Sequence, residues 1–448
     1  MKKLLFPSLF IVFSLILVMV VWAFMPKYSG MITFFFFFLI FDGYLWLSVL
    51  RWSKNFTTGA KAFIAVLFWS PLIFLVSLIF YAFFVPYLKW SLPLRTYIQS
   101  CILILFLAEF FPILTLLLAD LIRLIKFSWM FFTRKKAISL FALSRFKPLL
   151  QAGWGMGALF FTIMAAGMIF WQFDFTVRQQ VIALNELPPA FEGLKIVQLS
   201  DIHLGSWGSE KQLQRAMNEI NELNPDLIFF TGDMFNYSTA DGKGFEEILK
   251  TLHAPLGIYA IMGNHDYGDY ITWPSATAKK QNIEELKSYY KTLGWKLLLN
   301  SHDILKRGQD SIAVIGVENW GATRRFQRHG NIAEAQRGTE TMAIQLLLSH
   351  DPSHWDSVVS KKYPQIDVTF AGHTHGGQVG IDCCNIHWSP ITWVNRLWCG
   401  LYSNPGSKTP QYLYVNQGLG NIGYAGRVGI LPEITLITLK RSLSPHNP

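Results

Sequence analysis

Long apolar stretches dominate the first 173 residues, and they constrain the fold more than any other feature of this chain. Five of them are long enough to cross a bilayer, because about 20 apolar residues span its hydrocarbon core as a helix. They cover residues 4–25, 30–50, 62–86, 97–121 and 153–173. The first is longer than the core of a signal peptide and lacks a clear cleavage site of small residues, so we interpret it as a retained span.

Charge is divided unevenly along the chain. The net charge is +10, but the first 173 residues hold 15 Lys and Arg against three acidic residues. The rest is nearly neutral, with 24 basic and 26 acidic groups. We therefore expect no nucleic-acid partner, because phosphate backbones are bound by clustered cations. The many aromatic residues also exclude a disordered tail protein.

The cations of the apolar part predict its topology. The N-terminus and the loops 51–61 and 122–150 together hold twelve Lys and Arg, and the other two loops hold three. By the positive-inside rule the N-terminus is cytoplasmic, and five crossings place everything after about residue 174 outside the cytoplasm. This predicts a multi-pass protein of a bacterial cytoplasmic membrane. Segment 122–150, which mixes cations with Phe, Trp and Leu, is expected to lie along the cytoplasmic interface.

Two features within the predicted spans leave alternatives open. Asp42 and Glu109 fall near the middle of spans, where a charge is costly, so each is expected to be protonated, paired or functional. Gly153 and Gly157 form a GxxxG pattern. That pattern favours close packing of helices, either within the chain or in a dimer.

After a predicted linker at 174–192, the pattern changes to that of a soluble domain over 193–440, followed by a tail at 441–448. Short apolar runs, each about as long as a buried strand, alternate with amphipathic helices. The runs are 196–199, 227–230, 258–262, 312–317, 344–348 and 368–370. Ser209 followed by Gln212 has the spacing of a capping box and marks the start of the first helix. The alternation predicts a layered α/β domain with several parallel strands.

Polar side chains follow five of these six runs. They are Asp201 and His203, then Asp233, then Asn264, His265 and Asp266, then His350 and Asp351, and finally His373 and His375. In sheets of this kind, functional groups collect beyond the carboxyl ends of the strands. One such residue alone usually caps a strand or helix, but five sites in register predict a metal centre.

The ligand types indicate which metals and which chemistry to expect. Carboxylate, amide and imidazole groups without a nearby thiolate suit Mn²⁺, Fe or Zn²⁺. Asp233, in the middle of the array, is the expected bridge between two divalent metal ions. Such a pair clamps a phosphoryl oxygen and lowers the pKa of a bridging water, which gives a hydroxide nucleophile near neutral pH. His265 is placed to protonate the leaving group, with Asp266 as its orienting partner.

These residues match the motifs of a known family. Asp201-Ile202-His203, Gly232-Asp233, Gly263-Asn264-His265-Asp266, Ser349-His350 and Gly372-His373-Thr374-His375 resemble, in order and spacing, the five motifs of calcineurin-like metallophosphoesterases. The longer run 372–378, with 416–420 and 432–434, is similar to the membrane-associated YkuE-like branch of that superfamily. The resemblance covers roughly 193–440. It implies a four-layer αββα sandwich, joined here to an N-terminal α-helical transmembrane bundle of about five spans.

The resemblance also implies the role of each site residue. One metal would be held by Asp201, His203, Asp233 and His375, and the other by Asp233, Asn264, His350 and His373. His265 would be the catalytic histidine. One position departs from the pattern, because Asn236 stands where this branch often has a second acid. We expect altered tuning there and no loss of activity.

Other residues bear on the substrate. Ser389 and Pro390 form a typical helix start, and apolar residues follow at helical spacing through 402. This predicts a helix within 386–402, either in the core or at the membrane interface, where it would admit lipid tails. An apolar cleft wall is expected from Tyr267, Tyr270 and Trp273. Arg427 is expected either to bind substrate phosphate or to lie on the surface.

The cysteines cluster late in the chain. Cys101 lies in a predicted span, whereas Cys383, Cys384 and Cys399 lie in the predicted exported domain. In an oxidising compartment, Cys399 is expected to pair with Cys383 or Cys384.

The sequence thus predicts a membrane-anchored, dinuclear metal-dependent phosphoesterase that hydrolyses a phosphodiester or pyrophosphate bond of a lipid. One alternative is a UDP-2,3-diacylglucosamine-type pyrophosphatase of lipid A synthesis, which conflicts with the predicted topology because nucleotide sugars are mostly cytoplasmic. Another alternative makes the helical bundle the working part, as a sensor or transporter with a regulatory phosphoesterase domain. The oligomeric state is left open.

Overall fold

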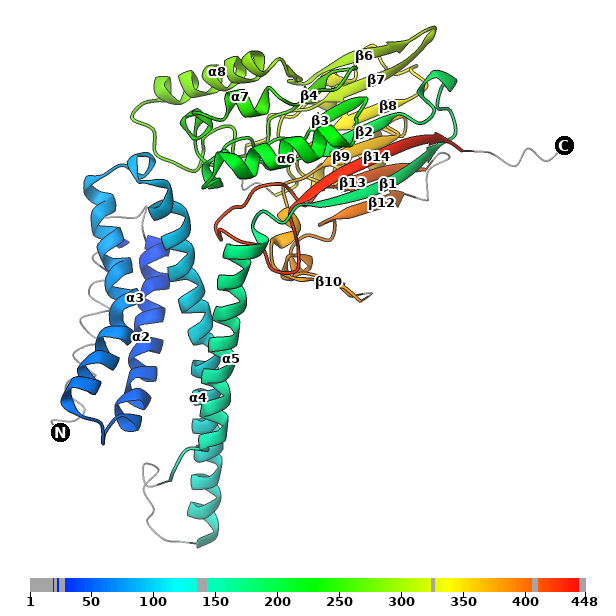
Figure 1. Ribbon diagram of the computed structural model, residues 1–448. Helices are drawn as coiled ribbons and strands as arrows, with labels where there is room; N and C mark the ends of the chain where they lie inside the picture. Colours follow the sequence, from blue (N-terminus) through cyan, green and yellow to red (C-terminus); the bar gives the residue numbers. More distant parts are fainter. Residues whose placement is uncertain are drawn as a thin grey trace. The chain divides into compact units, whose positions relative to one another are not determined.

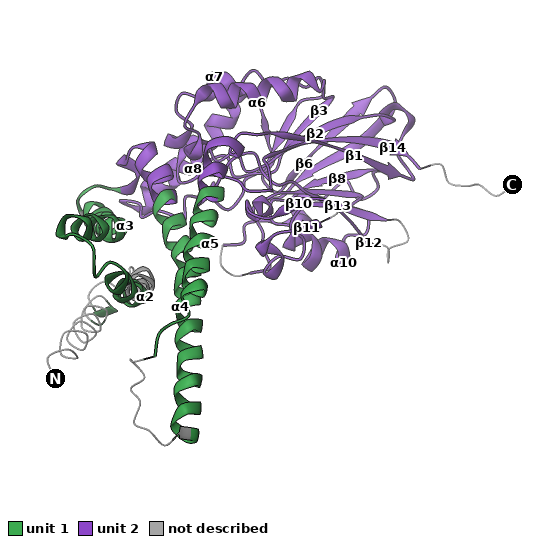
Figure 2. Cartoon of the chain, turned by 60° about the horizontal axis from the view of Figure 1, so that its bottom comes forward, with its two compact units in different colours: residues 1–86, 101–163 green, residues 87–100, 164–448 purple. Residues whose placement is uncertain are grey.

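The structure is a computed structural model, and it describes residues 19, 22–23, 29–134, 143–323, 327–384, 386–404 and 410–442. The chain divides into two compact units (Figure 2). The first comprises Met1–Pro86 and Cys101–Ile163, and the second comprises Tyr87–Ser100 and Met164–Pro448. The short segment 87–100 and the end of the last long helix therefore belong to the same unit as the soluble domain.

Long helices make up the described part of the first unit. They are α2 (Ser29–Trp52), α3 (Thr58–Phe84), α4 (Gln99–Arg134) and α5 (Lys147–Ala166). Among the described residues, three stretches are long and apolar enough to cross a membrane: Thr58–Ala82, Pro93–Thr133 and Lys147–Trp171. They correspond to the third, fourth and fifth predicted spans. The first predicted span lies almost wholly outside the described residues, and the second falls in α2, so the count of five stays a prediction.

Details of the helices answer two questions that the sequence left open. Asp42 and Glu109 are hydrogen-bonded to each other, so they are paired within the bundle. A Cβ on Gly157 would lie 2.7 Å from the carbonyl oxygen of Ala108, and one on Gly153 would meet Thr115. The GxxxG pattern thus packs α5 closely against α4 of the same chain.

The predicted interfacial position of segment 122–150 stays a prediction. Residues 122–134 continue α4, and residues 135–142 lie outside the described residues. The apolar helical pattern runs on past residue 121 without a Gly or Pro that would end the helix.

Two six-stranded sheets form the body of the second unit (Figure 1). The first has the order β1-β14-β2-β3-β4-β5, and the second has the order β12-β13-β9-β8-β7-β6. Their bounds are β1 Thr176–Leu184, β2 Lys195–Leu199, β3 Leu227–Phe230, β4 Ile258–Ala260, β5 Lys296–Leu297, β6 Ser301–Arg307, β7 Asp310–Gly316, β8 Gln345–Leu348, β9 Val368–Ala371, β12 Gly400–Asn404, β13 Gln411–Val415 and β14 Glu433–Arg441. A two-stranded hairpin joins β10 (Ile381–Cys383) to β11 (Ile386–Trp388).

All six predicted strands are present, and most of them pair in parallel. Strands β2 to β5 are parallel to one another in the first sheet, where β2 is antiparallel to β14, and β7, β8, β9 and β13 are parallel to one another in the second. The carboxyl ends of β2, β3 and β4 therefore share one edge, as do those of β8 and β9.

The core lies between the two sheets. Their inner side chains form one cluster, in which Phe229 of β3 meets Phe370 of β9 with ring centroids 4.8 Å apart. Helices α6 (Glu210–Glu222), α7 (Glu246–Leu249) and α8 (Ala276–Leu293) belong to the apolar cluster on the other face of the first sheet. The outer face of the second sheet packs against α9 (Ile332–Ala335) and η9 (Trp355–Val359). Helix α10 (Ser360–Lys362) follows η9 directly.

Short helical turns complete the unit. They are η2 (Tyr87–Lys89), η3 (Pro93–Ile98), η5 (Gly167–Trp171), η6 (Pro189–Phe191), η7 (Leu204–Ser206), η8 (Thr239–Gly242), η10 (His375–Gly377) and η11 (Pro390–Trp393). Three of them, η7, η10 and η11, lie in loops that follow strands or the hairpin and that carry site residues or their neighbours.

Three local predictions need correction. The predicted linker 174–192 contains β1, whose residues pair in parallel with β14 along its whole length. Ser209 does begin α6, but its side chain makes no capping hydrogen bond. The predicted helix within 386–402 is absent, since this stretch holds β11, the single turn η11 and the start of β12. Pairing of β12 with β13 extends the second sheet there, and this tertiary contact overrides the helical spacing.

Candidate metal centre

The predicted site residues come from the loops that directly follow β2, β3, β4, β8 and β9. Burial is nearly complete for Asp201, His203, Asp233, Asn264, His350 and His375. His373 is the most accessible member, with 22% of its side chain exposed. Because the two sheets face each other, loops from both meet over the same core, and residues up to 174 positions apart come together.

Backbone conformation singles out the same loops. Nine residues other than glycine have a positive φ among the described residues, and five of them are predicted ligands. These are Asp201, His203, Asp233, His373 and His375. The left-handed conformation is costly for such residues and persists only where the surrounding structure enforces it, often at functional sites. The loops are therefore held in shapes that aim these side chains inward.

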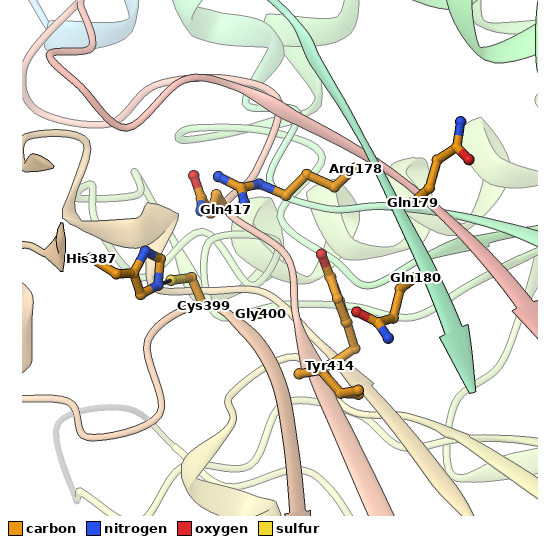
Figure 3. A pocket seen from close by; sticks show the side chains of 9 residues that line it. Arg178, Gln179, Gln180, His387, Cys399, Gly400, Tyr414 and Gln417 are labelled. Carbon is orange, nitrogen blue, oxygen red and sulfur yellow. Dashed lines mark hydrogen bonds between the residues drawn. The ribbon is translucent and has the colours of Figure 1, made fainter. Parts of the chain in front are cut away.

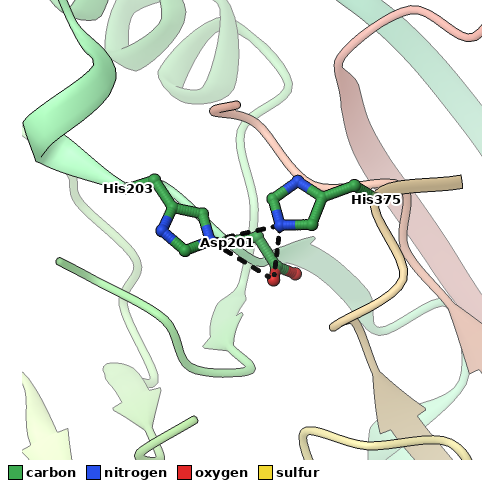
Figure 4. Close-up of side chains that lie close together, drawn as sticks. All are labelled: Asp201, His203 and His375. Atoms are coloured by element: carbon green, nitrogen blue, oxygen red, sulfur yellow. Dashed lines mark hydrogen bonds and ion pairs between the residues drawn. The ribbon is translucent and has the colours of Figure 1, made fainter. Parts of the chain in front are cut away.

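Asp201, His203 and His375 form a first cluster of metal-ligating atoms (Figure 4). The Nε2 of His375 lies 3.2 Å from the Oδ1 of Asp201 and 3.1 Å from the Nε2 of His203. The Oδ1 of Asp201 is buried and has no hydrogen-bond partner among the described residues. Two facing ring nitrogens and a bare carboxylate oxygen around one point are a donor set that fits a cation.

Asp233, His350 and His373 form a second cluster. The Nε2 of His350 lies 3.2 Å from the Oδ2 of Asp233 and 3.1 Å from the Oδ1 of Asn264. Its Nδ1 is 2.7 Å from the carbonyl oxygen of Thr231, to which it donates, and this leaves Nε2 directed at the cluster. The same Oδ2 of Asp233 is 3.6 Å from the Nε2 of His203, so Asp233 lies between the two clusters.

The electrostatics of the clusters also favour cations. Burial by itself would raise the pKa of the Asp201 and Asp233 carboxyls, but the imidazoles of His375 and His350 outweigh it and hold both pKa values well below their ordinary range. Burial opposes a charge on His350, yet the neighbouring Asp233 raises its pKa to about 10. The buried carboxylates are thus compensated by imidazole charge, and a divalent cation bound here would take the place of those protons, because metal binding to such ligands releases them.

His265 lies at the edge of this arrangement. Its Nδ1 donates to the carbonyl oxygen of Asn236 at 2.8 Å, and its ring stacks on Tyr270 with centroids 3.8 Å apart and planes 4° apart. One ring nitrogen groups with ligand atoms of His203 and Asp233. Burial lowers the pKa of His265. The imidazole is thus held in one orientation beside the bridging carboxylate.

Asp266 does not orient His265, and that prediction is wrong. Its carboxylate accepts hydrogen bonds from the backbone amides of Asp233 at 2.9 Å, Met234 at 3.0 Å and Gly263 at 2.9 Å. Burial, followed by the charge of Asp233, raises the pKa of Asp266 to about 7. Asp266 therefore fastens the loop after β3 to the loop after β4, and the orienting partner of His265 is the backbone of Asn236.

The expectation that Arg427 lies on the surface is wrong, because its side chain is fully buried. Its contact with substrate phosphate stays a prediction. The guanidinium donates to the carbonyl oxygens of Gly420 at 2.7 Å, Gly418 at 3.1 Å and His375 at 3.3 Å. Arg427 fixes the loop that carries His375. Sequence gives no signal for this role, because the acceptors are backbone atoms of two segments, the turn at His375 and the loop 418–420.

The other predicted residues fall in different places. Tyr270 covers His265, and its hydroxyl accepts a hydrogen bond from the Asn264 amide at 2.8 Å. Tyr267 is buried with its hydroxyl on Glu318, and Trp273 donates to the carbonyl oxygen of Gly268, so these two form no cleft wall with Tyr270. All four cysteines are free, because the Sγ of Cys399 lies against His387 instead of another thiol.

Comparison with known families identifies the domain. The family model for calcineurin-like phosphoesterases matches residues 194–377. This match takes in all the site loops, from Asp201 to His375. The chain carries a calcineurin-like phosphoesterase domain. The membrane-associated branch predicted from the motifs is represented among its relatives.

Three known proteins are similar to this chain over part of its length. A transmembrane protein with metallophosphoesterase domain from Danio rerio is 32% identical over 270 residues, which are 58% of this chain and 56% of that protein. Metallophosphoesterase YkuE of Bacillus subtilis is 29% identical, over 58% of this chain and 84% of its own length. UDP-2,3-diacylglucosamine pyrophosphatase LpxG of Chlamydia trachomatis is 26% identical, over 59% of this chain and 92% of its own length. This chain thus spans about half the length of the zebrafish relative.

Proposed function

We propose that this protein is a membrane-associated hydrolase that binds two divalent metal ions and cleaves a phosphodiester or pyrophosphate bond of a lipid. The position of Asp233 carries the proposal, because one carboxylate oxygen lies within 3.6 Å of imidazoles from both clusters. A carboxylate shared in this way is what a dinuclear site requires. The proposed ligands are Asp201, His203, Asp233 and His375 for one ion, and Asp233, Asn264, His350 and His373 for the other. Manganese, iron and zinc all suit this donor set.

Two cations bound here would clamp a phosphoryl group and lower the pKa of bound water. The residues of the chain do the remaining work. The carbonyl oxygen of Asn236 and the ring of Tyr270 hold His265 so that its Nε2 faces the centre. An anionic substrate raises the pKa of this imidazole on arrival, since a nearby negative charge favours the protonated form. The imidazolium then donates its Nε2 proton to the leaving oxygen.

The fold supports the same proposal. Two stacked six-stranded sheets with helices on their outer faces are the arrangement expected of the four-layer αββα sandwich. The apolar helices of the first unit support membrane association. A lipid substrate follows from placing such a centre on a chain with membrane spans, which brings it to a surface where lipid phosphoesters are concentrated.

A UDP-2,3-diacylglucosamine-type pyrophosphatase is the second candidate, favoured by the similarity to LpxG over 92% of that protein. It needs the catalytic domain in the cytoplasm, where nucleotide sugars are found. The positive-inside rule favours a cytoplasmic N-terminus and an extracytoplasmic domain. A phosphatase or fluorescent reporter fused after residue 190 separates the two, because a cytoplasmic signal overturns our topology and supports the second candidate.

Activity of the purified protein tests the proposal directly. With Mn²⁺, we expect hydrolysis of a phospholipid or lipid-linked phosphate at a higher kcat/KM than that of soluble nucleotides. Chelation and the variants Asp233→Ala and His265→Ala should each remove the activity. Full activity in both variants would overturn the mechanism, and much faster cleavage of soluble nucleotides would overturn the lipid substrate.

A further inference from the structure

Exposed apolar side chains of the second unit concentrate in one short stretch around the β10–β11 hairpin. They are Ile381, Ile386, Trp388, Trp393 and Val394, with Trp393 78% and Val394 76% exposed. Beyond Trp171, the other large hydrophobic residues of comparable exposure in the described chain are Val177, Val181 and Tyr270. We call the five residues from 381 to 394 the apolar face.

The apolar side of the hairpin is exposed. Its register pairs Ile381 with Trp388 and Asp382 with His387. Directly opposed residues share one side of a hairpin and neighbours along a strand alternate, so Ile381 and Trp388 lie on one side and Asp382 and His387 on the other. Strands with one solvated side normally direct their polar residues outward and their apolar residues inward. Here Ile381, Ile386 and Trp388 are exposed although they are apolar, while Asp382 on the polar side is 20% exposed and His387 is 45% exposed.

Specific contacts hold the polar side against the domain. Asp382 forms an ion pair with Arg178 of β1 and lies 3.0 Å from the Nδ1 of His387. The Nε2 of His387 is 2.9 Å from the Sγ of buried Cys399 (Figure 3). Arg178, His387 and Cys399, which make these contacts, also line a pocket together with Tyr414. The exposure of the apolar side is therefore built into the fold and is not a matter of a loose loop.

The turn after β11 continues the apolar face. Ser389 caps η11 and donates from its hydroxyl to the carbonyl oxygen of Val379 at 2.8 Å. The rings of Trp388 and Trp393 meet edge to face with centroids 5.8 Å apart. Tryptophan is the side chain that membrane–water interfaces favour most clearly, because its ring is apolar and its indole N–H remains hydrated.

Hydrogen bonds within the second unit connect this region to the ends of two candidate spans. Residues Pro93–Ser100 and Met164–Trp171 belong to those spans and also to the second unit. Ser100 accepts at its hydroxyl from the amide of Ala425 at 2.8 Å, and the hydroxyl of Tyr424 donates to the carbonyl oxygen of Met164. The loop 424–428 is thus attached to both span ends.

The same loop is attached to the segment that begins the hairpin. The side-chain amide of Gln378 donates to the carbonyl oxygens of Tyr424 at 2.7 Å and Gly426 at 3.0 Å. The backbone N–H of Gly380 donates to the carbonyl oxygen of Val428 at 2.8 Å. Gly380 directly precedes β10. One hydrogen-bonded loop therefore separates the apolar face from chain that enters the bilayer.

We propose that the apolar face inserts into the interfacial layer of the bilayer that the chain's own helices cross. The partner is a lipid surface, and the bound elements are the hairpin and η11. The docking itself needs no catalysis. It deepens the proposed function by giving the substrate a route, because the proposed ligand His375 lies only six residues before Ile381 on the same segment. A lipid phosphoester leaving the bilayer at the hairpin would reach the metal centre along that segment.

Fluorescence quenching on the full chain in phosphatidylcholine–phosphatidylglycerol nanodiscs tests the docking. A parent variant carries Cys101→Ser, Cys383→Ser and Cys384→Ser, and it measures background labelling because Cys399 is buried. An environment-sensitive probe is then placed at Trp393→Cys. The matched control is Glu340→Cys, an exposed residue near the start of β8, at the edge of the sheet opposite the metal centre.

We expect the probe at 393 to lose at least half of its emission to lipids that carry a nitroxide near the headgroup, and little to aqueous iodide. The control probe should show the reverse. Quenching at 393 by iodide alone would mean a water-facing surface and overturn the proposal. Quenching by neither agent would mean that protein, either a second copy or a partner, covers the apolar face, and this also overturns it.

Kinetics of the double variant Trp393→Ser, Val394→Ser provide a second test. Its KM for a phosphoester embedded in nanodiscs should rise by about tenfold or more, because about 1.4 kcal/mol of lost apolar burial corresponds to tenfold. Its rate on a soluble phosphodiester should stay that of the parent. An equal effect on both substrates would overturn the docking, whereas a parent inactive on every phosphoester would overturn the proposed function alone.

Discussion

Asp266 offers the sharpest test of how the site is built. The sequence suggested an orienting partner for His265, whereas in the structure Asp266 accepts hydrogen bonds from four backbone amides and so joins the loops after β3 and β4. The substitution Asp266→Asn keeps one acceptor oxygen and places an amide group where Asp233 and Gly263 donate. The perturbation therefore removes two hydrogen bonds and leaves buried donors unpaired.

The magnitude follows from those two amides. A buried donor without a partner costs about 1–3 kcal/mol, so the two lost hydrogen bonds cost about 2–6 kcal/mol. Burial raises the pKa of Asp266 to about 7, so removal of the buried charge at pH 8 offsets up to about 4 kcal/mol of that cost. The free energy of unfolding at pH 8 should therefore fall by about 2 kcal/mol at most, which corresponds to about 4–8 °C in Tm. Metal affinity should fall as well, because Asp233 and Asn264 lie on the two loops that Asp266 joins.

The assay is thermal unfolding of the detergent-solubilised protein at pH 8, where the Asp266 carboxyl is ionised, together with calorimetric titration of Mn²⁺. Asp310→Asn is the matched control, because this carboxylate accepts from a single amide, that of Ala190, and lies away from the site. The control should keep its Tm within about 2 °C, since it retains an acceptor oxygen for that one bond. An Asp266→Asn protein with unchanged Tm and Mn²⁺ affinity, but with a lower kcat, would refute the reasoning and restore the orienting role.

Three further predictions concern other parts of the molecule. Asp233→Ala should lower kcat/KM by more than about 100-fold and abolish binding of a second Mn²⁺. Mutating a residue that only hydrogen-bonds to a metal ligand already lowers metal affinity or activity about 10–100-fold, and Asp233 is a proposed ligand itself. Titration calorimetry checks the stoichiometry. Burial raises the pKa of Asp367 to about 7. The wild type therefore loses stability as pH rises from about 4 to 7. Compared with the wild type, Asp367→Asn should unfold at a higher temperature at pH 8 but not at pH 4. The gain is up to about 4 kcal/mol, and an equal gain at both pH values would contradict it. Gly157→Leu should lower the Tm in detergent by disrupting the packing of α5 on α4, at a cost of about 1–3 kcal/mol, whereas Gly155→Leu, whose Cβ would meet nothing, should not.

Much of the site was predictable because each proposed ligand is marked by its neighbours in the sequence. Each of Asp201, Asp233, Asn264, His350 and His375 follows a short apolar run, and all the runs that they follow became strands. Burial of a strand and the position of its carboxyl end are properties of a few consecutive residues. Sequence alone therefore determined the α/β class, the composition of the candidate metal centre and the presence of long apolar helices.

Tertiary structure decided what depends on distant backbone. The carbonyl oxygen of Asn236 holds His265, and the amides around Asp266 define its role. Three carbonyl oxygens from two distant segments accept hydrogen bonds from Arg427. Backbone groups are identical in every residue, so no sequence pattern marks which of them a side chain will meet. Packing likewise overrode local preference at 386–402, where edge pairing in the second sheet replaced a helix and turned the hairpin's apolar side outward. The sequence determined which groups are available for chemistry, and the fold determined which of them meet, because contacts between distant segments form only when the two sheets pack.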